Sequence, residues 1–396
     1  MTSTHPSHIT VQVAGTELCL LAEKALWWPE RRTLLIADLH LGKAAGYRAL
    51  GQPVPSGTTA CIYGWSVLAN GTLAPVPGMP YGSNGGSDIG VAQNFLFAAD
   101  VKQVESWAIQ SDGSLKVGPT SPAPWEGGAS EGPLSLSFDL TQQDLYANYS
   151  LNGTYQAYII GSNGTLQYVD YANADEASSW LSFTGNDAYG YQSACYHGTP
   201  GIYGYARASN GGLSVAWHPA NPPQPSGLPS GGSSYCPWGA ATIGNSNVII
   251  AEVPTNAYSQ TGPWQMVNFT IAADGSLTTT DTASTAPTVS VGGVSDYRFD
   301  PTGTWLAVGG TTGVQIFHWA NGKLTSTSTV PIPAANGVFR LRWDDAGHLF
   351  VVNSNTDTGT TLYVFNVVNG VATPAPDSPR FIPGVLAAGL TVKPLS

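Results

Sequence analysis

Three arginines stand in or beside short apolar segments, in the stretches SDYRFD and FRLRWDD. Arg298, Arg340 and Arg342 each carry a permanently charged guanidinium, which binds carboxylates and phosphates through paired hydrogen bonds. They are candidates for an anion-binding site, and the alternative is that each is paired with a structural carboxylate.

Residues 128–132 match the Gly-x-Ser-x-Gly spacing of a nucleophile elbow. That elbow needs a strand and then a helix, whereas here a loop precedes and a predicted strand follows, so we expect no serine nucleophile.

Two of the four cysteines could form a disulfide. Cys195 and Cys236 lie in loops rich in small residues, SACYHG and SSYCPWG. We expect a disulfide between them if the chain is exported; two separate thiols are the alternative, because spacing alone does not fix connectivity.

Residues 1–10 show no basic segment followed by an apolar run, so they predict no signal peptide. The localisation therefore stays open.

Charge is sparse and uneven along the 396 residues. Charged residues make up 10% of the chain, against the usual ~25%. Residues 1–60 hold five of the 14 basic and four of the 25 acidic residues, so the net charge is +1 there and −12 in the remainder. Residues 61–396 are too acidic to neutralise a run of phosphates, which excludes nucleic-acid binding by this part of the chain. No run reaches the ~18 apolar residues of a membrane span.

A short unit recurs seven times: a strand with an aromatic residue, then in most copies Asn-Gly or Asp-Gly, a small residue and Leu. The copies are 63–73, 105–115, 156–166, 203–213, 267–277, 314–324 and 362–372. Asn-Gly and Asp-Gly suit the positive φ of tight turns, so each copy predicts a β-hairpin. In the last two copies Phe317 and Phe365 stand four rather than five residues before the Asn, which predicts a shorter turn. We expect the aromatic rings to pack between neighbouring sheets.

A second unit precedes some of the hairpins. An aromatic residue and Asp open a turn, and a hydrophobic strand follows, at 138–149, 299–310 and 343–354. Together the two units give three or four short strands per ~45–50 residues, which predicts an all-β fold, a seven-bladed β-propeller over residues 62–396. Four tryptophans fall outside the hairpin unit and are candidates for a surface ligand site: Trp125, Trp180, Trp217 and Trp238.

The repeat resembles that of the lactonase-like seven-bladed propellers related to 6-phosphogluconolactonase. The features that carry the resemblance are the aromatic strand, the (N/D)G(S/T)L turn and a loop that ends in proline, as in GPTSP at 118–122. Members that open lactones carry a Gly-Pro-Arg-His segment, and the matching places here, 128–139 and 292–303, contain no Arg-His pair. The resemblance implies a channel-side position for Arg298, Arg340 and Arg342, where they would bind an anionic ligand.

The first sixty residues carry a different resemblance. The stretches WWPERRTLLIADLHLGKA and GQPVPSGTT are similar to the start of the calcineurin-like metallophosphoesterase that accompanies a DNA ligase in bacterial DNA repair. The resemblance implies that residues 1–60 are a truncated fragment of an α/β fold, in which Asp38 and His40 are ligands of a two-metal site. None of the four histidines after His40 lies in a matching later motif, so we expect an empty relic.

The fragment also lacks the helices that would cover its central strand. We expect residues 1–60 either to be partly disordered or to lend strand 33–37 or 10–14 to the open edge of the first blade. Two unrelated resemblances in one chain indicate a gene fusion, natural or introduced by assembly.

The sequence therefore predicts a lactonase-like propeller that binds an unidentified small-molecule or protein ligand, or acts as a scaffold, without catalysis. We expect a monomer without a cofactor; a divalent metal would be needed only for a phosphoesterase. The alternative function is hydrolysis of a lactone or similar small substrate in the channel. A metal-dependent phosphoesterase is the more distant alternative.

Overall fold

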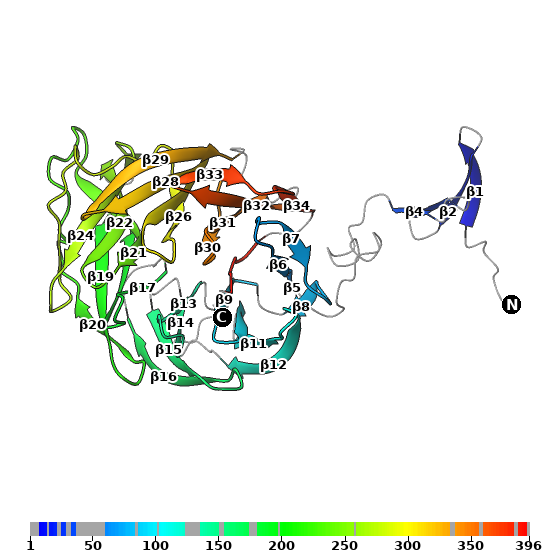
Figure 1. The fold of residues 1–396 in the computed structure, drawn as a ribbon, viewed down its shortest axis with the longest axis horizontal. Helices are drawn as coiled ribbons and strands as arrows, with labels where there is room; N and C mark the ends of the chain where they lie inside the picture. Colours follow the sequence, from blue (N-terminus) through cyan, green and yellow to red (C-terminus); the bar gives the residue numbers. More distant parts are fainter. Residues whose placement is uncertain are drawn as a thin grey trace. The chain divides into compact units, whose positions relative to one another are not determined.

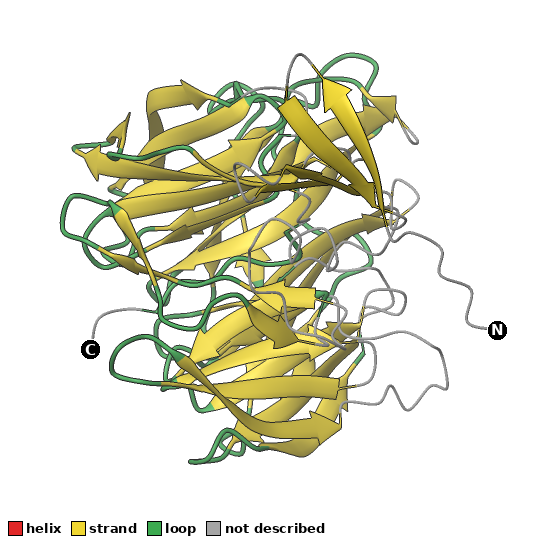
Figure 2. Ribbon diagram, turned by 90° about the vertical axis from the view of Figure 1, so that its right-hand side faces the viewer, coloured by secondary structure: helices red, strands yellow, loops and turns green. Residues whose placement is uncertain are grey.

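The computed structural model describes residues 60–83, 86–100, 103–122, 135–149, 154–173, 180–196, 199–256, 259–332, 337–355, 359–383 and 387–393, and the strand backbones 8–13, 16–21, 25–28 and 33–36. Every regular element among these residues is a β-strand (Figure 2). No described segment forms a helix that could span a membrane. The chain divides into two compact units, Met1–Tyr63 with Gly78–Ser83, and Gly64–Pro77 with Asn84–Ser396.

The second unit contains six antiparallel sheets, which we call blades 1 to 6. Blade 1 contains β9 (Asp88–Ala92), β10 (Phe95–Asp100), β11 (Gln103–Ile109) and β12 (Leu115–Pro122). Blade 2 contains β13 (Ser135–Phe138), β14 (Asp144–Tyr149), β15 (Thr154–Ile160) and β16 (Leu166–Ala172). Blade 3 contains β17 (Ser182–Phe183), β18 (Tyr189–Tyr196), β19 (Thr199–Arg207) and β20 (Leu213–Trp217).

Blades 4 and 6 each add a fifth strand. Blade 4 contains β21 (Ser234–Ile243), β22 (Asn247–Asn256), β23 (Ser259–Gln260), β24 (Gln265–Ile271) and β25 (Leu277–Thr278). Blade 5 contains β26 (Val294–Phe299), β27 (Trp305–Gly310), β28 (Gly313–Ala320) and β29 (Lys323–Pro331). Blade 6 contains β30 (Arg340–Trp343), β31 (His348–Asn355), β32 (Gly359–Val368), β33 (Val371–Pro374) and β34 (Arg380–Pro383). Figure 1 shows the six blades arranged around a centre, with first strands such as β9, β13, β26 and β30 innermost.

The predicted count of seven blades is wrong for the described chain, which has six. The first hairpin copy forms a two-stranded sheet of β6 (Trp65–Val67) and β7 (Leu73–Pro75), without the two inner strands of a blade. This hairpin lies between blades 6 and 1. Leu73 packs with Phe350 and Leu362 of blade 6, and a Cβ placed on Gly113 of blade 1 would lie 3.3 Å from Val76.

The repeated glycine belongs to the outer hairpin of each blade, and this explains the miscount. The glycines of the first five copies, from Gly71 to Gly275, have φ of 81 to 82°. In the last two copies Asn321-Gly322 and Asn369-Gly370 both have positive φ, so the predicted shorter turn is confirmed as a two-residue hairpin turn. The inner hairpins, which define a complete blade, are less uniform: positive φ falls on Gly244, Gly303 and Gly347 in blades 4 to 6, but on Gln93, Gln142 and Asp187 in blades 1 to 3.

Apolar side chains fill the spaces between successive sheets, as predicted from the aromatic positions. The hairpin aromatics of the six blades are at most 6% exposed: Trp107, Tyr158, Tyr205, Phe269, Phe317 and Phe365. Phe317, for example, packs with Ile249 and Met266 of the preceding blade. Since each such ring buries roughly 150–250 Å² of surface, these layers are the main source of stability.

Residues 387–393 follow blade 6 and pass beside the first strand of blade 1. They form no strand. The amide of Ala387 donates to Oγ1 of Thr360, and Nζ of Lys393 donates to Oδ1 of Asn94 at 2.8 Å. A Cβ on Gly389 would lie 2.6 Å from the backbone N of Ile89, so this close approach needs glycine.

The first unit contains a four-stranded antiparallel meander, in the order β1 (His8–Val13), β2 (Thr16–Leu21), β3 (Ala25–Trp28) and β4 (Thr33–Ile36), and a short pair of β5 (Ala60–Ile62) and β8 (Tyr81–Ser83). The described residues do not support the expected α/β phosphoesterase fragment: β4 is an edge strand that pairs antiparallel to β3 rather than a central strand. Strands 8–13 and 33–36 pair within this meander, not with β6. No observation supports a gene fusion.

Candidate functional site

Polar side chains on the first strands join one blade to the next around the centre of the ring. In each case a carboxylate or hydroxyl oxygen accepts a hydrogen bond from a backbone N–H in the next blade's first strand or directly before it. The pairs are Asp88 with Leu136, Ser137 with Leu181, Ser182 with Thr242, and Asp296 with Leu341, at 2.9–3.0 Å. These bonds hold the first strands in fixed register around the axis.

The three predicted arginines gather at one part of this inner ring. Arg298 follows Asp296 by two residues on β26, and Arg340 and Arg342 are likewise two apart on β30, so each pair lies on one face of its strand. Nη2 of Arg298 lies 3.3 Å from Oδ1 of Asp296, and Nη1 of Arg342 lies 2.9 Å from Oδ2. The Asp296 side chain is fully buried, whereas those of Arg298 and Arg342 are 23% and 22% exposed.

The electrostatics of the cluster keep Asp296 ionised. Burial alone would raise the pKa of its carboxyl, but the guanidiniums of Arg298, Arg342 and Arg340, with the Leu341 N–H, hold that pKa below its usual value. Burial also lowers the pKa of Arg298 to about 9, because a charged group loses hydration there. Arg298 therefore still carries its positive charge at neutral pH.

Arg340 is the cation of the cluster that has no carboxylate of its own. Its Nη1 donates to the carbonyl oxygen of Phe339 at 3.1 Å, and its guanidinium lies 4.4 Å from the centre of the Phe339 ring. It makes no ion pair with any described residue, and its side chain is half-buried. Such a guanidinium keeps hydrogen-bonding capacity for an added anion.

Asp88 on β9 contributes a second buried carboxylate. It is 3% exposed; Oδ2 accepts the Leu136 N–H, and Oδ1 accepts no hydrogen bond from a described residue. Burial raises the pKa of Asp88, and the charges of Arg340 and Arg342 partly offset this effect. Three cations thus face two carboxylates, one of which is poorly stabilised in its charged form, so the cluster has an excess of positive charge.

Trp180 belongs to this cluster rather than to the surface. It is 9% exposed, its Nε1 donates to the carbonyl oxygen of Ala240 at 2.6 Å, and the Arg298 guanidinium lies 4.0 Å from its ring centre. This cation–π contact and the edge-on packing of Trp180 against Tyr297 hold Arg298 in place. The predicted surface role of Trp180 is therefore wrong, because the residue fills the space between blades.

Of the other predicted tryptophans, two pack between blades and one lies outside the described residues. Trp238 is half-buried against the core between blades 4 and 5, and its Nε1 donates to the carbonyl oxygen of Ser295 at 3.4 Å. Trp217 packs at the edge of the core between blades 3 and 4. Four predicted sites lie outside the described residues: Trp125, residues 128–132, Asp38 and His40. The described part of the chain contains no cluster of three metal-ligating side chains.

Cys195 and Cys236 are joined by a disulfide, with their Cα atoms 5.3 Å apart. Cys195 lies on β18 of blade 3 and Cys236 on β21 of blade 4, so the bond links two neighbouring blades. Cys61, on β5, carries a free thiol.

Sequence reasoning found the arginines but missed the two carboxylates that organise them. The signal for Asp296 is its position two residues before Arg298, which places both side chains on one strand face. Asp88 carries no comparable local signal, since its partners come from β13 and from the remote residues 340–342.

Comparison with solved structures shows that the chain has a β-propeller fold similar to that of proteins named as gluconolactonase or putative 6-phosphogluconolactonase. A protein from Lactobacillus plantarum superposes with a TM-score of 0.60 at 17% identity, covering 83% of this chain and 96% of that one. A putative 6-phosphogluconolactonase from Bacteroides uniformis gives 0.57 at 15% identity, covering 83% and 95%. The periplasmic gluconolactonase of Pseudomonas aeruginosa gives 0.52 at 16% identity, covering 72% and 83%. No protein-family model and no curated protein sequence matches the chain.

Proposed function

We propose that this propeller is a binding module for a small anionic molecule, held near the axis by Arg340 together with Arg342 and Arg298. The observation that carries the proposal is the half-buried guanidinium of Arg340, which has no ion-pair partner among the described residues and lies in a cluster with excess positive charge. A carboxylate or phosphate would provide the missing counter-charge through paired hydrogen bonds.

The ligand class follows from the surroundings of the arginines. The chain as a whole carries a net charge of −11, so a local excess of positive charge would select an anion against the general field. Sugar acids and their phosphate esters fit this description, and the solved relatives include proteins named as gluconolactonase and putative 6-phosphogluconolactonase. We therefore propose gluconate-like and phosphogluconate-like molecules as the first ligands to test.

Hydrolysis of a lactone in the channel is the alternative function, and the fold likeness is the observation that favours it. Three histidines have described side chains, and none lies on a first strand: His218 stacks on Tyr203, His318 lies on β28, and His348 is hydrogen-bonded to Asp344 at 2.6 Å. A general base at the arginine cluster would have to be Asp88 or Asp296, and Asp296 is committed to two guanidiniums. We therefore place binding ahead of hydrolysis.

We also propose that the chain functions after export from the cytoplasm. The disulfide between Cys195 and Cys236 supports this, because such bonds persist in oxidising compartments. The likeness to a periplasmic protein points the same way.

The test is calorimetric titration of the full chain with 6-phosphogluconate and with gluconate at low ionic strength. We expect saturable binding that weakens with added salt and falls at least tenfold in Arg340→Gln. Lys116→Gln removes an exposed cation of β12 and serves as the charge-matched control, which should bind like the unaltered chain. Absence of saturable binding, or equal binding by Arg340→Gln, would refute the proposal.

A lactone-hydrolysis assay on glucono-δ-lactone separates the two functions. The binding proposal predicts no turnover above the spontaneous rate. Turnover that is lost in Arg298→Ala would instead establish the hydrolase.

A further inference from the structure

The outer strand of blade 4 is interrupted. β25 contains two residues, whereas the outer strands β12, β16 and β29 of other blades contain eight, seven and nine. After Thr278 the chain leaves the edge of β24 and returns where the amide of Met266 donates to the carbonyl oxygen of Pro287. Residues 279–286 therefore form a loop that leaves part of β24 without an outer neighbour.

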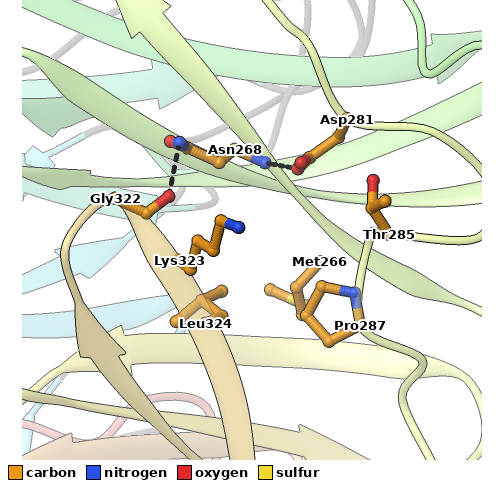
Figure 3. A pocket seen from close by; sticks show the side chains of 8 residues that line it. All are labelled: Met266, Asn268, Asp281, Thr285, Pro287, Gly322, Lys323 and Leu324. Carbon is orange, nitrogen blue, oxygen red and sulfur yellow. Dashed lines mark hydrogen bonds between the residues drawn. The ribbon is translucent and has the colours of Figure 1, made fainter.

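A cavity of about 90 Å³ lies where the loop leaves the sheet, between blade 4 and the β28–β29 turn of blade 5 (Figure 3). Its apolar lining comes from Met266, Pro287 and Leu324, and its polar lining includes Asn268, Asp281 and Lys323. Met266 is fully buried, so its side chain forms part of a fixed wall.

Asn268, which lines this cavity, has one hydrogen-bonding group left over. Its backbone N–H donates to Oδ2 of Asp281 at 2.8 Å, and its Nδ2 donates to the carbonyl oxygen of Gly322 at 3.1 Å (Figure 3). Its Oδ1 is buried and accepts no hydrogen bond from a described residue. A buried acceptor without a donor is costly, so a donor from outside the chain would be stabilising here.

The charges at the cavity suit a neutral ligand. Burial raises the pKa of Asp281, while the Asn268 N–H and the charge of Lys323 partly offset this effect. One carboxylate and one ammonium group therefore line the same small space, so neither a cation nor an anion is favoured. One hydroxyl group can donate to the Asn268 oxygen and a neighbouring hydroxyl to Asp281, and either can accept from Lys323.

We propose that this cavity binds the edge of a polyol or sugar, with two neighbouring hydroxyl groups on the polar side and the C–H face against Met266, Pro287 and Leu324. The volume equals roughly three water molecules, so a diol fragment of glycerol size fits and a whole sugar ring does not. The site shares no residue with the arginine cluster and does not depend on the proposed anion binding.

Methyl resonances of methionine give a direct test, because the chain contains three methionines: Met1, Met79 and Met266. In the full chain labelled with ¹³C at the methionine methyl groups, we expect glycerol to shift the Met266 signal saturably, with a Kd on the order of 1–10 mM. The signal is assigned by its loss in Met266→Leu. An equal concentration of 1-propanol, which lacks the second hydroxyl, should cause no saturable shift.

Two matched variants distinguish the site from a general solvent effect. Asn268→Leu removes the unpaired acceptor and should weaken glycerol binding at least tenfold. Asn366→Leu is the control, because Asn366 makes the equivalent hydrogen bond from β32 to the carbonyl oxygen of Asn70 at 3.2 Å and should bind normally. A linear shift without saturation, an equal response to 1-propanol, or unchanged binding by Asn268→Leu would overturn the proposal.

Discussion

Oδ2 of Asp296 lies 2.9 Å from Nη1 of Arg342 and also accepts the Leu341 N–H, so one buried carboxylate ties the first strand of blade 5 to that of blade 6. The same carboxylate lies 3.3 Å from Arg298 on its own strand. A single side chain thus fixes two of the three arginines of the cluster.

Asp296→Asn keeps an acceptor for Leu341 but leaves two guanidiniums without a counter-charge. We expect it to lower the free energy of unfolding by about 2–3 kcal/mol at pH 7, less than for a fully buried pair because both arginines are partly exposed. The folded-state pKa of Asp296 is lowered, so its stabilising contribution is present above the ordinary Asp pKa and is lost as the pH falls. Urea unfolding at pH 7 and at a pH well below 3.8, the ordinary Asp pKa, measures this, with exposed Asp345→Asn as control. Equal stability of all three proteins at pH 7 would contradict it.

Glu252→Gln should stabilise the protein at neutral and higher pH. Glu252 is 1% exposed, its Oε2 accepts no hydrogen bond from a described residue, and burial and the charge of Asp281 raise its pKa well above the usual value. A raised folded-state pKa means that stability is lost as the pH rises through it, and the glutamine variant avoids this loss. We expect a higher free energy of unfolding for the variant at pH 8 and no such gain at pH 4. Thermal unfolding across this range checks it, and parallel pH profiles would refute it.

Gly389→Ala should loosen the segment 387–393. The new Cβ would lie 2.6 Å from both Oδ1 of Asp88 and the backbone N of Ile89, closer than atoms can approach. We expect faster amide exchange at Ile89 and a loss of about 1–3 kcal/mol, the usual cost of overpacking. Gly293→Ala is the control, since its nearest neighbour would be 3.6 Å away. Equal exchange in both variants would show that the segment does not pack on β9.

Removing the disulfide should destabilise the junction of blades 3 and 4. Cys195 and Cys236 are 41 residues apart, and a loop of this length gives a stabilisation of about 3–4 kcal/mol by restricting the unfolded chain. The double variant Cys195→Ser/Cys236→Ser should lose this amount in denaturant unfolding, whereas Cys61→Ser should not. A stability unaffected by the double change would argue that the bond does not form in solution.

The outer hairpin of each blade could be predicted from the sequence more readily than the inner hairpin. The outer hairpins were predicted because their turns need glycine at positive φ, a requirement that is local. The inner turns of blades 4 to 6 also place glycine at positive φ, but in those of blades 1 to 3 the residues at positive φ are Gln93, Gln142 and Asp187. These conformations are held by bonds between blades, as when the Gln93 N–H donates to Oε1 of Gln142 at 2.6 Å. Counting glycine turns therefore gave seven, whereas complete blades number six in the described chain.

The amino-acid sequence by itself determined the all-β character, the seven outer hairpins and the burial of their aromatic rings, because turn chemistry and strand alternation act over a few residues. Only the tertiary structure decided how many hairpins gain two inner strands, and which carboxylates face Arg298, Arg340 and Arg342. Those contacts join strands from different blades, such as β9 with β13 and β26 with β30. No local pattern records them, because closing the ring is what brings these strands together.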